Sequence, residues 1–83
     1  MTRVKVCGIT GAEDAAAAVA AGADALGFVF AAGSPRRVEA GVAAGIAAAL
    51  PPFIATVGVF VDQPLEEILE VAGRCRLQWI QLH

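Results

Sequence analysis

Four short hydrophobic runs divide the chain, and stretches with helical features lie between them. The runs cover residues 4–7, 25–30, 54–61 and 77–83. The second and third are apolar without interruption and rich in β-branched or aromatic residues, which is typical of strands in a parallel sheet that is covered on both faces. The first run alternates, so that Val4 and Val6 share one face while Lys5 and Cys7 share the other.

The first intervening stretch, residues 11–21, is predicted to be a helix. Thr10 and Glu13 have the spacing of a capping box at its start. Gly22 follows its end and suits the residue after the C-cap, because glycine adopts positive φ without a steric penalty.

Helices are also predicted over residues 39–50 and from Pro64 to residues 73–76. Val42, Ile46 and Leu50 recur at four-residue spacing in the first of these, and Pro51-Pro52 ends it. In the second, Pro64 suits the first helical position, and Asp62 is expected to cap the helix. The residues expected to form its buried face are Leu65, Ile68, Leu69 and Ala72.

The resulting order, β-α-β-α-β-α-β, places the chain in the α/β class. Short links between alternating strands and helices predict a parallel sheet with right-handed crossovers. Two architectures fit this pattern, namely a doubly wound sheet and a section of a (β/α) barrel.

Composition narrows the classes of function. The chain has 83 residues, which predicts one small domain, and its net charge of -2 gives no basic footprint for nucleic acid. Residues 38–61 contain glycines and two adjacent prolines, so they predict a helix, a turn and a strand rather than a membrane span. No apolar signal-peptide segment follows Met1, and we therefore expect a cytoplasmic protein. Two cysteines and one histidine support neither a disulfide framework nor a metal site.

Cys7 is the residue best placed for chemistry. It stands at the carboxyl end of the first predicted strand, where parallel α/β proteins build their active sites. A thiolate is an effective base or nucleophile. The alternative is a small buried core residue, which most free cysteines are. Cys75, after a predicted helix and at the opposite end of the sheet, is expected to be structural.

Two further groups of polar residues follow predicted strands. Arg36 and Arg37 lie in the loop after the second strand, where a guanidinium can bind a carboxylate or phosphate, unless the pair is simply solvated. Gln81 and His83 share one face of the last strand and either line a site or belong to a frayed end. Gly27 and Gly58 lie inside strands and indicate close approach of a ligand or another backbone.

Taken together, five segments resemble the N-terminal half of the phosphoribosylanthranilate isomerase family, in order and at the family's spacing. They are KVCGIT at 5–10, GADALGFVF at 22–30, SPRR at 34–37, VGVFV at 57–61 and QLH at 81–83. The resemblance implies that residues 1–83 form the first half of a (β/α)8 barrel, the TIM barrel, within a longer single domain.

The resemblance also implies an isomerase of tryptophan biosynthesis that needs no cofactor. Its small-molecule substrate, N-(5-phosphoribosyl)anthranilate, undergoes an Amadori rearrangement to 1-(2-carboxyphenylamino)-1-deoxyribulose 5-phosphate. Cys7 matches the family's general base, which removes the proton from sugar C2. Arg36 matches an arginine that contacts the substrate, and His83, with Gln81 beside it, is expected to line the substrate site.

The family's general-acid aspartate and main phosphate-binding loops lie beyond the fourth strand. We therefore expect these 83 residues to be a truncated piece of a longer enzyme and to be inactive alone. The expected partner of this piece is the C-terminal half-barrel or a second copy of the chain. Two other interpretations remain open, namely another phosphosugar barrel isomerase and a non-catalytic half-barrel that self-associates.

Overall fold

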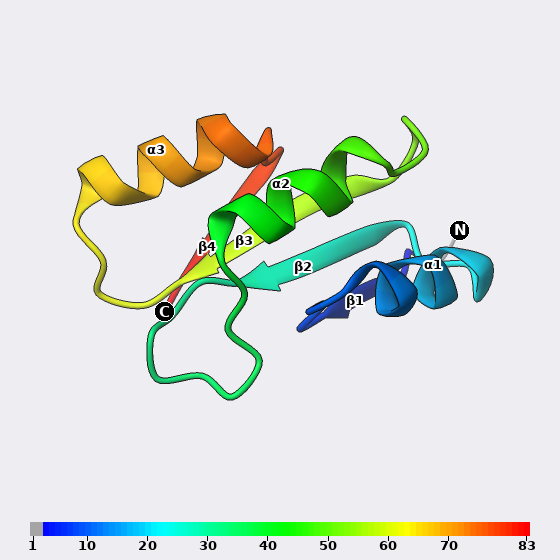
Figure 1. Cartoon of the computed structure of the whole chain (residues 1–83), viewed down its shortest axis with the longest axis horizontal. Helices are drawn as coiled ribbons and strands as arrows, with labels where there is room; N and C mark the ends of the chain where they lie inside the picture. Colours follow the sequence, from blue (N-terminus) through cyan, green and yellow to red (C-terminus); the bar gives the residue numbers. More distant parts are fainter. Residues whose placement is uncertain (1–2) are drawn as a thin grey trace.

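A four-stranded parallel sheet organises the structure, a computed structural model that describes residues 3–83 (Figure 1). The strands are β1 (Lys5–Cys7), β2 (Ala25–Val29), β3 (Ala55–Phe60) and β4 (Trp79–Leu82), and the helices are α1 (Ala12–Ala20), α2 (Ala40–Ala48) and α3 (Leu65–Cys75). The strands pair in the order β1-β2-β3-β4, all parallel. The predicted alternation of elements is therefore confirmed, and the four strands and the first two helices are each shorter than predicted.

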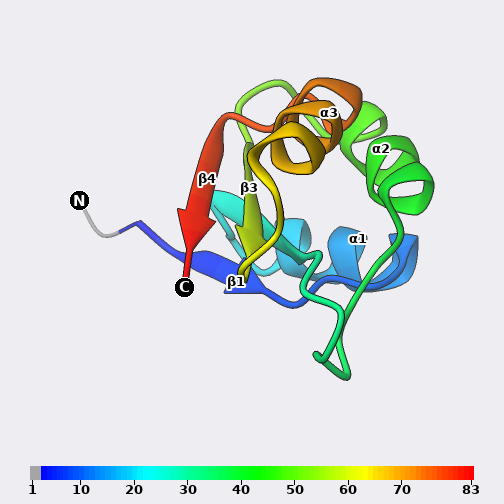
Figure 2. The ribbon, with the colours of Figure 1, turned by 90° about the vertical axis from the view of Figure 1, so that its left-hand side faces the viewer.

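The arrangement of the layers distinguishes the two candidate architectures. The strand order follows the chain order, and the three helices lie on the same side of the sheet (Figure 2). A doubly wound sheet reverses its strand order at a switch point and carries helices on both faces. A (β/α) barrel adds strands in sequence and places its helices outside. The structure therefore has the arrangement of a barrel section.

The hydrophobic core fills the space between the sheet and the helices. Leu26 and Phe28 of β2 and Phe60 of β3 are fully buried, and the rings of Phe30 and Phe60 stack with their centroids 5.2 Å apart. The helices contribute Ala15 and Ala18 from α1, Ala43 and Ile46 from α2, and Ile68, Val71 and Cys75 from α3. Large side chains thus come mainly from the strands, while α1 and α2 pack closely through alanines.

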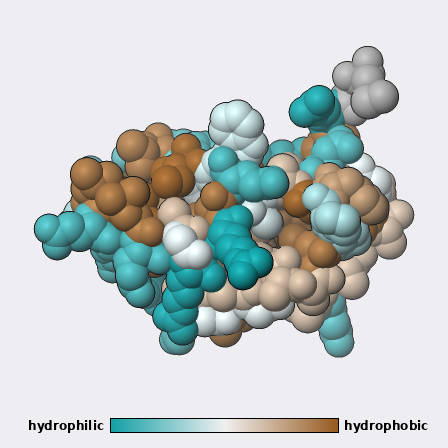
Figure 3. All heavy atoms as spheres, turned by 90° about the horizontal axis from the view of Figure 1, so that it is seen from above, coloured by the Kyte–Doolittle hydropathy of each residue, from teal (hydrophilic) through white to brown (hydrophobic). Residues whose placement is uncertain are grey.

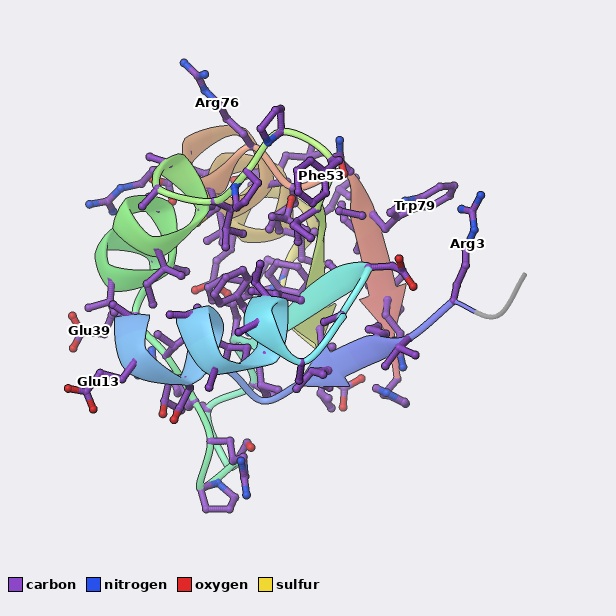
Figure 4. The ribbon with its side chains drawn as sticks, turned by 90° about the vertical axis from the view of Figure 1, so that its right-hand side faces the viewer. Arg3, Glu13, Glu39, Phe53, Arg76 and Trp79 are labelled. Atoms are coloured by element: carbon purple, nitrogen blue, oxygen red, sulfur yellow. The ribbon has the colours of Figure 1, made fainter. Side chains whose placement is uncertain are left out.

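The opposite face of the sheet, here called the inner face, carries Lys5, Cys7, Gly27, Trp79 and Gln81. The strand register places these residues on alternate positions from the buried Leu26. Trp79 is 67% exposed, and its side chain projects away from the molecule (Figure 4). Within residues 3–83 no helix covers this face. The apolar strands predicted a sheet that is covered on both faces, and the helices cover only one of them.

The start of α1 differs from the prediction. Gly11 occupies the N-cap in an extended conformation, with no side-chain capping hydrogen bond. The Thr10 hydroxyl instead donates to Asp14 Oδ2 at 3.2 Å, so the expected capping box with Glu13 was wrong. The end of the helix is as predicted, because Gly22 has φ of 98° and donates to the carbonyl of Val19.

The predicted buried faces of α2 and α3 were only partly right. Val42 of α2 is 48% exposed, whereas Ile46 is buried as expected. In α3, Leu65 and Leu69 are exposed, while Ile68 faces the core together with Val71 and Cys75. Hydrophobic atoms gather at the left of the helix-covered side, where Figure 1 places α3 (Figure 3).

Pro64 is the N-cap of α3 rather than its first helical residue, so the helix begins at Leu65. Asp62 makes no capping bond and adopts φ of 56°, in the left-handed region. No helix among residues 3–83 is long and apolar enough to cross a membrane.

Cys75 joins α3 to α2 inside the core. The residue is 1% exposed, and its thiol donates to the carbonyl oxygen of Ala40 at 3.3 Å. Burial raises the pKa of the Cys75 thiol, and of the two charged neighbours Arg74 acts against this while Glu70 adds to it. The structural role expected for this cysteine agrees with its position.

Two glycine substitutions test the packing between sheet and helices. A Cβ on Gly58 would overlap Leu77 Cδ1 and lie 2.9 Å from Phe60 Cε2, so Gly58→Ala should lower the free energy of unfolding by about 1–3 kcal/mol. A Cβ added to Gly45 in α2 would have no atom within 4 Å, so Gly45→Ala should raise the free energy of unfolding by about 1 kcal/mol. Urea unfolding of both variants measures the difference. Equal effects would contradict the assigned packing of β3.

Candidate functional site at the carboxyl ends of the strands

The carboxyl ends of the four strands lie together at one end of the sheet, because all four strands are parallel. Cys7 ends β1, the loop from Phe30 to Val38 follows β2, Gln63 follows β3, and His83 follows β4. The His83 backbone N–H donates to the Phe60 carbonyl at 3.1 Å, which extends the pairing of β4 with β3 to the last residue. The predicted site residues therefore lie on neighbouring segments.

Cys7 lies on the inner face and is exposed. Its neighbour across the sheet is Gly27, on which a Cβ would stand 3.0 Å from Cys7 Sγ and 3.2 Å from Cys7 Cα. The close backbone approach predicted at Gly27 is thus confirmed, and it leaves space for the thiol. Gly58, in contrast, is crowded by side chains on the helix-covered face.

Arg36 lies against the backbone immediately after Cys7. Gly8 has φ of +84°, and a Cβ there would stand 2.7 Å from Arg36 Cδ. Glycine is needed at this position both for the left-handed conformation and for the approach of the arginine. The structure thus brings the Arg36 side chain and the Cys7 thiol to the same end of the sheet, where the strands finish.

Ser34 organises the loop that carries Arg36. Its hydroxyl accepts the Arg36 N–H at 3.2 Å, and its carbonyl accepts the Arg37 N–H at 3.2 Å. The loop then returns to the sheet, where the Val38 N–H donates to the Val29 carbonyl at 2.9 Å. These bonds hold Arg36 by its backbone, beside the end of β2.

Arg37 has different surroundings from Arg36. It forms an isolated bridge with Val29 and lines a hollow of about 190 Å³ on the helix-covered side. Glu67 and Glu70 of α3 line the same hollow. The two adjacent arginines therefore separate, one toward Gly8 and the other toward α3.

Gln63 is a residue whose role the sequence did not indicate. Its Oε1 accepts the Val61 N–H at 2.6 Å, and its Nε2 donates to the Phe30 carbonyl at 2.8 Å. It thereby joins the segments that leave β2 and β3. A glutamine before a proline carries no sequence signal for this contact.

Gln81 and His83 lie together on the inner face, as predicted. Gln81 Nε2 is 2.9 Å from His83 Nε2, and Lys5 Nζ donates to Gln81 Oε1 at 2.8 Å. The contact with Lys5 connects the two edge strands, β1 and β4, although 76 positions separate the two residues. The sequence predicted the face of Lys5 but not its partner.

The larger hollows of the surface lie away from these residues. An apolar groove of about 630 Å³ separates α1 from α2, and a hollow of about 560 Å³ lies beside Pro51, Arg74 and Gln78. Neither is lined by Cys7, Arg36 or His83. Across residues 3–83, no cluster of three or more His, Cys, Asp or Glu side chains could hold a metal ion.

Comparison with known proteins identifies the relatives of the chain. The family model described as N-(5'phosphoribosyl)anthranilate (PRA) isomerase matches residues 4–83. N-(5'-phosphoribosyl)anthranilate isomerases from Geobacter metallireducens and Geobacter sulfurreducens are 59% and 61% identical over 83 residues. These are 100% of this chain and 41% of each relative, so the chain spans about two fifths of their length.

Solved structures of the same family also match the chain. The phosphoribosyl anthranilate isomerase of Thermotoga maritima matches with a TM-score of 0.97 and 51% identity, over 100% of this chain and 40% of that one. A second structure, in complex with reduced 1-(o-carboxyphenylamino)-1-deoxyribulose 5-phosphate, has the same TM-score and identity and covers 43% of its chain. The chain is folded as the first half of a (β/α)8 barrel, which confirms the predicted fold class.

The different surroundings of the two cysteines predict different reactivity. In the folded protein, iodoacetamide should modify Cys7, which is exposed, and leave Cys75, which is 1% exposed and whose pKa is raised by burial. Peptide mass spectrometry after short labelling distinguishes the two sites.

Unfolding in urea should make both cysteines reactive, and Cys7→Ser should abolish the rapid modification. Rapid labelling of Cys75 in the folded protein would show that the contact between α3 and α2 is not formed as described.

Proposed function

The chain belongs to the N-(5'-phosphoribosyl)anthranilate isomerase family, and we propose that it supplies the first half of the barrel of such an enzyme. The reaction is the Amadori rearrangement of N-(5-phosphoribosyl)anthranilate to 1-(2-carboxyphenylamino)-1-deoxyribulose 5-phosphate, a step of tryptophan biosynthesis. The observation that carries the proposal is the placement of Cys7 at the end of β1, beside Gly27 and the Arg36-bearing loop.

Cys7 is proposed as the general base. After the ribose ring opens, the substrate is a protonated Schiff base with an acidic proton on C2. The Cys7 thiolate removes that proton, and the electrons of the broken C–H bond move toward the iminium nitrogen to give an enolamine. Tautomerisation of the enolamine to the ketone completes the rearrangement. The exposed inner-face position of Cys7 and the space over Gly27 leave the thiol open to a substrate carbon.

Arg36 is proposed to bind the substrate near the reacting carbon. Its side chain lies across Gly8, directly after Cys7, and its backbone is held by Ser34. A guanidinium can form paired hydrogen bonds with a carboxylate or phosphate, and the substrate carries both groups. Gln81 and His83 are proposed to line the same site from β4.

The remaining part of the barrel is the proposed partner of this half. β1 and β4 each have one neighbouring strand within residues 3–83, and Trp79 and Leu82 on β4 are both 67% exposed. The relatives continue for about three fifths of their length beyond the matched segment. We propose that the corresponding residues pair with both edges and supply the general acid and the main phosphate site. Association of two copies would be an alternative closure.

Replacing the proposed base tests the function. In the enzyme that includes the C-terminal half, Cys7→Ser should lower kcat by about 10²–10⁴-fold, because a hydroxyl is a far weaker base than a thiolate. The assay follows the loss of anthranilate-type fluorescence as substrate is consumed.

Cys75→Ala is the matched control and should keep its turnover, with any loss confined to stability. Residues 1–83 alone should show no measurable conversion. A Cys7→Ser variant with a kcat close to that of the unmodified enzyme would refute Cys7 as the base.

The two adjacent arginines provide a second test. Arg36→Ala should lower kcat/KM by about 10²-fold, because substrate positioning near the reacting carbon is lost. Arg37→Ala, whose side chain lies on the helix-covered side, should leave kcat/KM nearly unchanged. Kinetics and urea unfolding are measured for both variants. A kcat/KM for Arg36→Ala close to that of the unmodified enzyme would place Arg36 outside the substrate site.

A further inference from the structure

Three hydrogen-bonded side chains, those of Lys5, Gln81 and His83, cross the inner face and have no part in the proton transfer described above. Lys5 Nζ is 2.8 Å from Gln81 Oε1, and Gln81 Nε2 is 2.9 Å from His83 Nε2. The His83 ring makes no other hydrogen bond within residues 3–83. The three residues therefore form one continuous series of donors and acceptors between β1 and β4.

The chemistry of the first residue sets the direction of the whole series. A lysine ammonium can only donate hydrogen bonds, so the glutamine atom that faces it must be the carbonyl oxygen. The amide nitrogen of Gln81 must then face His83, and this nitrogen can only donate. His83 Nε2 must accept that bond and therefore carries no proton.

We propose that Lys5 and Gln81 are positioning residues that hold His83 in the neutral Nδ1–H tautomer. The free histidine side chain prefers the Nε2–H form in water, so this is a reversal of the ordinary preference. The reversal leaves Nδ1–H as the ring's remaining hydrogen-bond donor at the carboxyl ends of the strands. His83 would then act on the substrate as a neutral donor to an oxygen atom and not as a second base at Nε2.

The identity of that oxygen-bearing ligand rests on the proposed function, but the tautomer does not. The tautomer depends only on the contacts among Lys5, Gln81 and His83. A chain without isomerase activity could still show the Nδ1–H form, and an active enzyme could still lack it. The two proposals can therefore fail separately.

Nuclear magnetic resonance of ¹⁵N-histidine-labelled protein tests the tautomer directly. Two-bond ¹H–¹⁵N correlations identify which ring nitrogen carries the proton. The His83 signals are assigned by their loss in His83→Gln. The expected result is the Nδ1–H form, and a predominant Nε2–H form would overturn the proposal.

Variants of Gln81 and Lys5 test whether these two residues set the tautomer of His83. Gln81→Glu replaces the donor amide with a carboxylate of similar shape that only accepts, so the ring should change to Nε2–H. Gln78→Glu makes the same change outside the series and should leave the tautomer unaltered. Lys5→Met should give a mixture of tautomers, whereas Lys5→Arg keeps a donor and should retain Nδ1–H. An unchanged tautomer in Gln81→Glu, with the fold verified by its amide spectrum, would overturn the assigned role of Gln81.

Discussion

The parallel pairing of β1 with β2 is the contact on which the candidate site depends. The register sets Cys7 opposite Gly27, and the Gly27 carbonyl accepts the N–H groups of both Gly8 and Ile9, at 3.0 and 3.1 Å. These bonds place the turn after Cys7, and with it the left-handed Gly8 on which Arg36 lies. A shift of one residue would turn Cys7 toward the helices, because side chains alternate between the faces of a strand. The register thus decides whether the thiol faces the exposed inner face or the core.

The uncovered inner face determines what this half can do. Charged and polar groups there, including Lys5 and Gln81, face solvent, where hydrogen bonds contribute little net free energy. A second set of strands would exclude water from this face and strengthen the same contacts electrostatically. It would also enclose the carboxyl ends of the strands on all sides. The half-barrel therefore holds these side chains in place, and the proposed C-terminal half would provide the enclosure that the proposed reaction requires.

Physical differences between strands and helices explain which expectations held. The strands were located well because apolar runs bounded by turn residues differ clearly from the alanine-rich stretches between them, although runs apolar on both faces did not show which face the helices cover. The helices were predicted less well, because alanine and glycine in α1 and α2 provide almost no contrast between buried and exposed positions. In α3, Leu65 and Leu69 have the spacing of a buried stripe, yet the helix lies with Ile68, Val71 and Cys75 against the sheet. Local spacing cannot specify rotation about a helix axis when both faces carry apolar residues.

The sequence by itself determined the order of elements, the family through its motifs, and the position of Cys7 at the carboxyl end of the first strand. These follow from hydrophobic period, from turn residues and from motifs, all of which are local along the chain. Only the tertiary structure distinguished Arg36 from Arg37, linked the ends of β2 and β3 through Gln63, and joined Lys5 to Gln81 across 76 positions. Such contacts depend on the curvature of the sheet and the paths of its loops. Those are set by many distant pairings together and by no single stretch of residues.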